Sequence, residues 1–143
     1  MLPYKKQDIV EFEGEYRGFR FYITIHPYIG HRCGYIIIPS NCCIYQRDYS
    51  TLKIEAHGGL TYSGFDFEDK WVIGFDCAHI GDAPDIKAAL KFYKNTEYEE
   101  SIKNNSKCMY GGKDDEIRTL DYCIDECKKI IDQILEKENL NNE

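Results

Sequence analysis

The sequence lacks a long apolar segment and an excess of basic residues, and each absence excludes a class of protein. No stretch reaches the roughly 18–20 apolar residues of a membrane-spanning helix, so we expect no membrane partner. The segment from Met1 to Asp8 also lacks the apolar run of a secretory signal peptide. Lys and Arg total 18 against 25 Asp and Glu, which gives a net charge of −7. A broad nucleic-acid surface needs clustered cations and is therefore not expected.

Cysteine is not scarce, but its number is odd. With seven Cys in the chain, at least one has no partner for a disulfide within it. Together with the missing signal-peptide pattern, this favours reduced thiols in a cytoplasm. A length of 143 residues suits a single domain, residues 1–143, which can bury a core without disulfides.

Strand patterns dominate the first half of the chain. The apolar residues Ile9, Val10 and Phe12 precede a predicted turn at Glu13–Glu15. Residues 16–25 end in four apolar side chains that alternate with Arg, Tyr and Thr. Tyr35–Ile38 is continuously apolar, which is typical of a central strand covered on both faces. The first half is therefore predicted to contribute most of a sheet.

Side chains that can bind a ligand, coordinate a metal or transfer a proton are concentrated in the region from His57 to Asp82. Gly58–Tyr62 and Lys70–Phe75 predict two antiparallel strands joined by a hairpin loop at 63–69. Asp82 and Pro84 then predict the start of a helix, with Asp82 at or near the N-cap.

The second half of the chain is helical in pattern. Residues 85–103 predict one short helix, followed by an irregular, mobile segment through Gly112. Asp114–Glu116 predicts the start of the longest helix. Apolar residues recur along it at spacings of three and four: Ile117, Leu120, Ile124, Cys127, Ile131 and Ile134. This stripe predicts packing on one face of the sheet, and it also allows a homodimer through the C-terminal helix.

Strands first and helices afterwards predict an α+β fold. We expect an antiparallel β-sheet with a short middle helix and a long amphipathic C-terminal helix packed on one face.

Three kinds of site are compatible with the central region. Cys77, His79, Asp82 and a distant His57 have the ligand chemistry of zinc, although their spacing matches no usual zinc signature. A second reading is a Cys–His pair, in which a histidine activates Cys77 or Cys33 as a nucleophile.

The third reading is a ligand-binding pocket, and it is our leading hypothesis. Glycine backbone N–H groups near a helix start suit an anion. Trp71 or a neighbouring Tyr would stack on a base, Asp76 would accept from ribose hydroxyls, and Arg118, with Arg32 as a second cation, would hold phosphate. This hypothesis assigns no metal and no cofactor. The expected ligand-binding residues are His57, Gly58, Gly59, Thr61, Trp71, Asp76, His79, Asp82 and Arg118.

The order of these motifs resembles a family of small, mostly uncharacterised proteins of bacteriophage and prophage genomes. The resembling segments are His31–Tyr35 with the Pro39 loop, His57–Thr61, Trp71–His79 with Gly81-Asp82, and Arg118–Tyr122. The chain departs from the family at Asn41–Cys43, where such proteins tend to have a Gly-His-Pro-like turn, and residues 85–112 look particular to it.

The resemblance implies a phage accessory protein in the cytoplasm of the infected bacterial host. By analogy, we expect an antagonist of bacterial immunity that binds and sequesters a small nucleotide-derived signal without chemistry. Two alternatives stay open. One is a metal-dependent hydrolase of such a signal, and the other is an inhibitor that binds a host defence protein.

Overall fold

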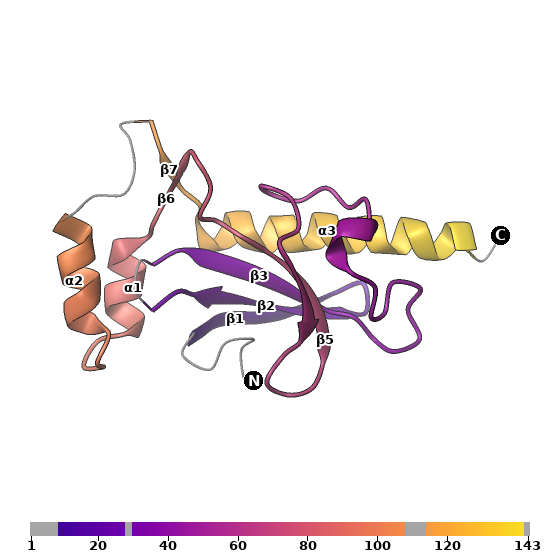
Figure 1. Cartoon of the computed structure of the whole chain (residues 1–143), viewed down its shortest axis with the longest axis horizontal. Coiled ribbons are helices and arrows are strands. Elements are labelled where there is room, and N and C mark those ends of the chain that lie inside the picture. The colour runs from indigo at the N-terminus through magenta and orange to yellow at the C-terminus, as the bar shows by residue number, and fades with distance from the viewer. Residues whose placement is uncertain (1–8, 28–29, 108–113, 142–143) are drawn as a thin grey trace.

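The computed structural model describes residues 9–27, 30–107 and 114–141, and they form an α+β fold as the sequence predicts. A five-stranded antiparallel sheet has the strand order β1-β2-β3-β5-β4. A long C-terminal helix crosses one face of this sheet, and two short helices lie at one end of it (Figure 1). The strands of the sheet are β1 Ile9–Tyr16, β2 Phe19–Ile25, β3 Arg32–Ile37, β4 Tyr62–Phe65 and β5 Trp71–Asp76. The remaining elements are the 3-10 turn η1 Tyr49–Thr51, the parallel pair β6 Asp82–Ala83 and β7 Glu116–Ile117, and the helices α1 Ile86–Phe92, α2 Glu99–Lys107 and α3 Leu120–Asn141.

The first hairpin turns at Arg17 and Gly18, so the turn expected at Glu13–Glu15 is wrong. Both residues have positive φ, 49° and 88°, which is the backbone of a two-residue hairpin turn that follows the twist of the strands. Glycine adopts this conformation without strain, whereas Gly14 lies inside β1, opposite Phe21. The position of the turn therefore depends on backbone conformation, which the apolar pattern does not report.

The central strand is β3, as its continuous apolar run predicts. Its neighbour α3 packs closely above Gly34, where an added Cβ would lie 2.5 Å from the Phe75 ring and 3.0 Å from Cys127 Sγ. Glycine at this position allows the helix to approach the sheet. The residues of α3 buried in the main core are Cys123, Cys127, Ile130, Ile131 and Ile134.

Helix α3 begins after Thr119, later than the predicted start at Asp114–Glu116. The Tyr122 N–H donates to Thr119 Oγ1 at 3.1 Å, which is the hydrogen bond of an N-cap. Glu116 and Ile117 instead form β7, and Ile117 is exposed. The rest of the predicted apolar stripe packs on the sheet. A homodimer through this helix stays a prediction, and it would have to form through the face of the helix that points away from the sheet.

The middle of the chain holds two short helices where one was predicted. Asp85, and not Asp82, caps α1: its carboxylate accepts the Ala88 N–H. Asp82 lies in β6 because its carboxylate is engaged by other segments. Helix α2 replaces part of the segment expected to be irregular, while residues 108–113 of that segment lie outside the described residues. The first strand of the central hairpin lies later than predicted: β4 spans Tyr62–Phe65, mostly inside the predicted loop at 63–69, and residues 57–58 form a turn.

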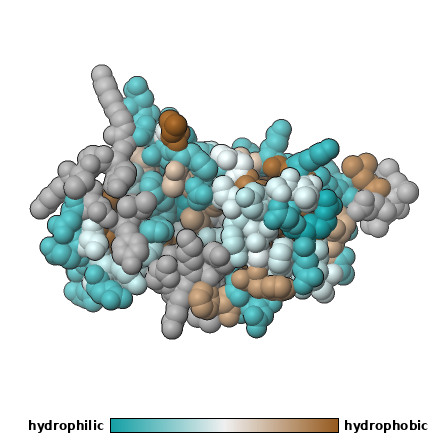
Figure 2. Space-filling model, viewed as in Figure 1, coloured by the Kyte–Doolittle hydropathy of each residue, from teal (hydrophilic) through white to brown (hydrophobic). Residues whose placement is uncertain are grey.

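The surface is mainly hydrophilic on the face drawn in Figure 2, where apolar colour is confined to separate areas. Among the residues that the structure describes, no helix combines the length and apolar character needed to cross a membrane. The exposed large apolar residues are Phe65, Phe67, Ile80, Ile117 and Leu140.

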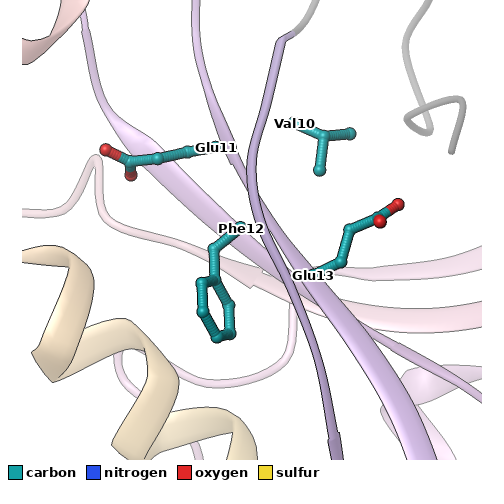
Figure 3. A pocket seen from close by; sticks show the side chains of 4 residues that line it. All are labelled: Val10, Glu11, Phe12 and Glu13. Carbon is teal, nitrogen blue, oxygen red and sulfur yellow. The ribbon is translucent and has the colours of Figure 1, made fainter.

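A β-bulge in β1 directs one carboxylate into the interior. Val10 pairs with Thr24 and Phe12 pairs with Ile23, so Glu11 is the extra residue of the bulge. Figure 3 shows Glu11 and Phe12 on one side of the strand and Val10 and Glu13 on the other. Glu11 Oε1 lies 2.6 Å from Arg32 Nε, and both side chains are almost fully buried, at 7% and 5% exposure.

We predict that Glu11→Ala lowers the free energy of unfolding by about 3 kcal/mol, because it leaves the buried Arg32 short of a charged partner. Urea unfolding followed by the fluorescence of Trp71 measures the change. The exposed Glu15 on the same strand is the control, and Glu15→Ala should stay within about 0.5 kcal/mol of wild type. Equal effects of the two substitutions would contradict this role for Glu11.

Candidate functional site

A buried carboxylate, Asp82, is the centre of the candidate site. Its side chain is 1% exposed and accepts hydrogen bonds from three segments of the chain. His57 Nε2 lies 2.8 Å from Oδ2, Arg118 Nε lies 2.8 Å from Oδ1, and the His79 backbone N–H donates to Oδ2 at 3.1 Å. Burial opposes ionisation of this carboxylate, but the hydrogen bonds from Arg118, His57 and His79 outweigh it and lower the pKa of Asp82.

His57 connects Asp82 to a tyrosine of α3. Its Nδ1 lies 2.7 Å from the Tyr122 hydroxyl, and the two rings meet edge to face with centroids 5.3 Å apart. Burial, followed by the charge of Glu126, raises the pKa of Tyr122, so its hydroxyl keeps its proton at neutral pH. The Tyr122 O–H then donates to His57 Nδ1, which leaves Nε2–H to donate to Asp82. We call Asp82, His57, His79, Arg118 and Tyr122 the Asp82 cluster.

Short turns and the small parallel ladder bring these residues together. His57 and Gly58 form a turn before β4, and Gly58 has φ of +66°. A Cβ there would lie 2.2 Å from the His79 ring, so glycine allows the two turns to touch. The pairing of β6 with β7 places Glu116 opposite Asp82, and Arg118 follows two residues later.

His79 and Asp76 form the outer part of the site. His79 Nε2 lies 3.2 Å from Asp76 Oδ1, with both side chains about one third exposed, at 31% and 32%. This nitrogen is buried and finds no aligned hydrogen-bond partner within the described ranges. Asp76 Oδ1 also accepts the Ala78 N–H at 3.1 Å, which shapes the loop that carries His79.

A third histidine, His31, lies beneath the cluster and was not among the predicted site residues. It is almost fully buried, and its Nδ1 has no hydrogen-bond partner among the residues the structure describes. Burial lowers the pKa of His31, against the opposing effects of a hydrogen bond to the Cys77 backbone and the charges of Asp82 and Asp76. His31 therefore stays neutral in the folded protein at neutral pH.

Most of the predicted site residues converge, but not all. His57, His79, Asp82 and Arg118 meet directly, with Gly58 and Asp76 beside them. Trp71 does not join them. It begins β5, whereas Asp76 ends that strand, and its ring packs between Tyr45 and Phe65 with centroids 6.4 Å and 5.1 Å away.

Two further predicted residues contribute backbone only. Gly59 donates its N–H to Ala56 O, and Thr61 donates its N–H to Gly74 O at the entry to β4. Tyr122 is the contact that the predictions missed, although it belongs to the Arg118–Tyr122 segment that resembles phage proteins. Its spacing of four residues from Arg118 was the available signal, and the Arg118 guanidinium lies 5.2 Å from the centre of its ring.

The second predicted cation, Arg32, is buried below the site and does not reach its surface. In addition to its ion pair with Glu11, Arg32 pairs with Asp85 at 2.9 Å, and its NH1 donates to the Arg118 carbonyl at 3.0 Å. Burial disfavours its charge, yet the two carboxylates raise the pKa of Arg32 above its usual value. Arg32 thus positions the backbone of Arg118 rather than a ligand.

The geometry brings His57, His79 and Asp82 of the zinc reading together but leaves Cys77 outside them. Cys77 is buried and directs its Sγ to Cys123 Sγ, 3.7 Å away, rather than to His57 or His79. The hydrogen bond with the Cys123 thiol, followed by burial, raises the pKa of Cys77, so this thiol is not activated as a nucleophile. In the described part of the chain, the ligand atoms close enough for a metal belong to Cys42, Cys43 and Glu138.

An open hollow of about 460 Å³ lies along β1 and is lined by Val10, Glu11, Phe12 and Glu13 (Figure 3). None of the predicted ligand-binding residues lines it. Two of its four lining side chains are carboxylates, so it is poorly suited to a phosphate-bearing ligand.

No family model, no curated protein and no solved structure matches this chain.

We predict that the protein loses stability as the pH falls below about 6.5. The pKa of His31 is lower in the folded protein than in the unfolded chain, so the unfolded chain takes up the proton first and is favoured by acid. Urea unfolding at pH 7 and pH 5 should show a slope of up to about 1.4 kcal/mol per pH unit from this one proton.

His31→Gln should flatten this slope whatever its effect on stability at pH 7. A slope in the variant equal to that of wild type would show that His31 is not the responsible group. Asp82 acts in the same direction at lower pH, because its stabilising contribution is present above pH 3.8 and is lost as the pH falls through its lowered pKa.

Proposed function

We propose that this chain is a phage-encoded antagonist of bacterial immunity that binds and sequesters a small nucleotide-derived signal at the Asp82 cluster, without chemistry. The observation that carries the proposal is the way buried Asp82 holds the Arg118 guanidinium in a fixed position, beside His57, while part of the guanidinium remains exposed. His57 and Arg118 are 12% and 22% exposed, against 1% for Asp82. Preorganised donors lose little conformational entropy on binding a ligand, which favours affinity.

Arg118 is the group best placed to hold a phosphate. Its Nε is committed to the buried Asp82, whereas its NH1 pairs with Glu116, which is 73% exposed. An exposed ion pair contributes little free energy, so a phosphate can replace Glu116 on this guanidinium. Arg–phosphate pairs are strong because two N–H groups bind two oxygens.

The neighbours of Arg118 suit the remaining parts of a nucleotide. Tyr122 takes the stacking role that Trp71 cannot fill, because its ring lies beside the guanidinium. Asp76, on the accessible side of His79, is placed to accept from ribose hydroxyls. Ile80, fully exposed in the loop after His79, offers apolar contact to a base.

A second candidate function is acid–base hydrolysis of such a signal, and one observation favours it. Tyr122, His57 and Asp82 form a continuous chain of hydrogen bonds, at 2.7 Å and 2.8 Å, in which the carboxylate would stabilise an imidazolium. This is the arrangement of a proton relay. It replaces the metal-dependent hydrolase as the enzymatic alternative, since Cys77 faces Cys123.

The binding proposal predicts a thermal shift with one member of a panel of cyclic dinucleotides and ADP-ribose derivatives. Arg118→Gln should weaken binding of that compound at least tenfold by removing the charged partner of the phosphate, as measured by calorimetry. Arg17→Gln is the matched control, because Arg17 pairs with Asp132 on the exposed surface away from the cluster. Its affinity should equal that of wild type.

Absence of a shift with the whole panel would count against a nucleotide ligand. If a defence protein from the host is then captured by wild type and lost with Ile80→Asp, the chain acts as a protein inhibitor instead.

Sequestration predicts that the bound compound is recovered intact by denaturing the complex after prolonged incubation. Mass spectrometry of the released ligand makes this measurement. If the compound is instead converted, Tyr122→Phe should abolish conversion and leave binding nearly unchanged, because it removes the relay hydroxyl alone. Tyr49→Phe, on the separate 3-10 turn, is the control and should behave as wild type. Conversion by wild type would replace the binding proposal with the enzymatic one.

A further inference from the structure

Two adjacent cysteines meet a carboxylate at the far end of α3. The sulfur atoms of Cys42 and Cys43 and a carboxylate oxygen of Glu138 all lie within 4.8 Å of one another. Glu138 is 16 residues beyond Tyr122 on the same helix, which corresponds to about 24 Å along its axis. This group is therefore separate from the Asp82 cluster.

Tight turns hold the two thiols beside the helix. The Cys42 N–H donates to Pro39 O, and the Tyr45 N–H donates to Cys42 O, each at 3.0 Å. The Cys43 N–H donates to Glu138 Oε1 at 2.5 Å, which ties the loop directly to the helix. The turn residue Ile44 is fully buried in the main core, so the loop is anchored there.

The donor set has the chemistry of a zinc site. Zinc is bound in proteins by Cys sulfur and by Asp or Glu oxygen. Cys42, Cys43 and Glu138 supply two sulfur atoms and one carboxylate. A bound metal would release the two thiol protons and form two thiolate ligands.

The spacing also fits this chemistry. Two sulfur atoms bound to one tetrahedral zinc lie about 3.8 Å apart, given zinc–sulfur distances of about 2.3 Å. The observed limit of 4.8 Å is close to this, so rotation about the side-chain bonds is enough to bring the atoms into place. Thiolates favour zinc over magnesium or calcium.

The geometry points to Cys42, Cys43 and Glu138 as a binding site for a thiophilic divalent cation such as Zn²⁺. Cys42 is buried, whereas Cys43 and Glu138 are half-buried, so the fourth coordination position faces solvent. The metal would join the 39–48 loop to the last turns of α3, segments separated by 95 residues between Cys43 and Glu138. This inference does not depend on ligand binding at the Asp82 cluster.

Cobalt titration of the reduced, metal-free, full-length protein tests the site, with Co²⁺ as the spectroscopic substitute for Zn²⁺. One equivalent should produce sulfur-to-cobalt charge-transfer absorption, and Zn²⁺ should remove it by displacement and raise the melting temperature. Cys43→Ser should lose the absorption, and Glu138→Gln, whose amide oxygen still accepts the Cys43 N–H, should weaken binding at least tenfold. Cys33→Ser, a half-buried thiol on β3, is the matched control and should titrate as wild type.

Three results would overturn the inference. The first is no charge-transfer absorption with the wild-type protein. The second is equal titration of wild type and Cys43→Ser, which would place the cobalt on other thiols. The third is a mass lower by two hydrogens under reducing conditions, mapped to Cys42 and Cys43, because a stable disulfide between them removes both ligands.

Discussion

The arrangement of this region of the molecule depends on the hydrogen bonds made by the buried carboxylate of Asp82. A buried, ionised carboxylate without partners would cost several kcal/mol. Its partners come from the turn before β4, the loop after β5 and the segment before α3, so these three segments must meet for the charge to be tolerated. Because the Asp82 carboxylate is engaged by these partners, Asp85 and not Asp82 caps α1.

A second buried charge supports the first from below. Arg32 on β3 is paired with Glu11 from the bulge in β1 and with Asp85 at the start of α1, and it also binds the backbone carbonyl of Arg118. Because a guanidinium has five donors in a rigid plane, one side chain can hold four segments in a fixed arrangement. The position of Arg118, and through it the exposed face of the site, therefore depends on the edge strand β1 at the opposite side of β3.

Helix α3 unites the two sites. Its first turn contributes Tyr122 to the Asp82 cluster, its middle packs on the sheet above Gly34, and its last turns bring Glu138 to Cys42 and Cys43. Both candidate sites therefore depend on where α3 packs on the sheet.

The sequence by itself determined the class of fold and the central strand, and it predicted that His57, His79, Asp82 and Arg118 lie in one region. Apolar periodicity predicts which faces are buried, and burial is a property of each segment that the pattern reports directly. The ends of the helices and strands were harder to predict from the sequence. The turn at Arg17-Gly18 depends on backbone conformation, and the cap at Asp85 depends on which aspartate already has other hydrogen-bond partners. Only the tertiary structure decided which side chains meet. It separated Trp71 from Asp76 along one strand, added Tyr122 and His31 to the site, and joined Cys42 and Cys43 to Glu138, because contacts between distant segments depend on strand order and helix position, which no local pattern contains.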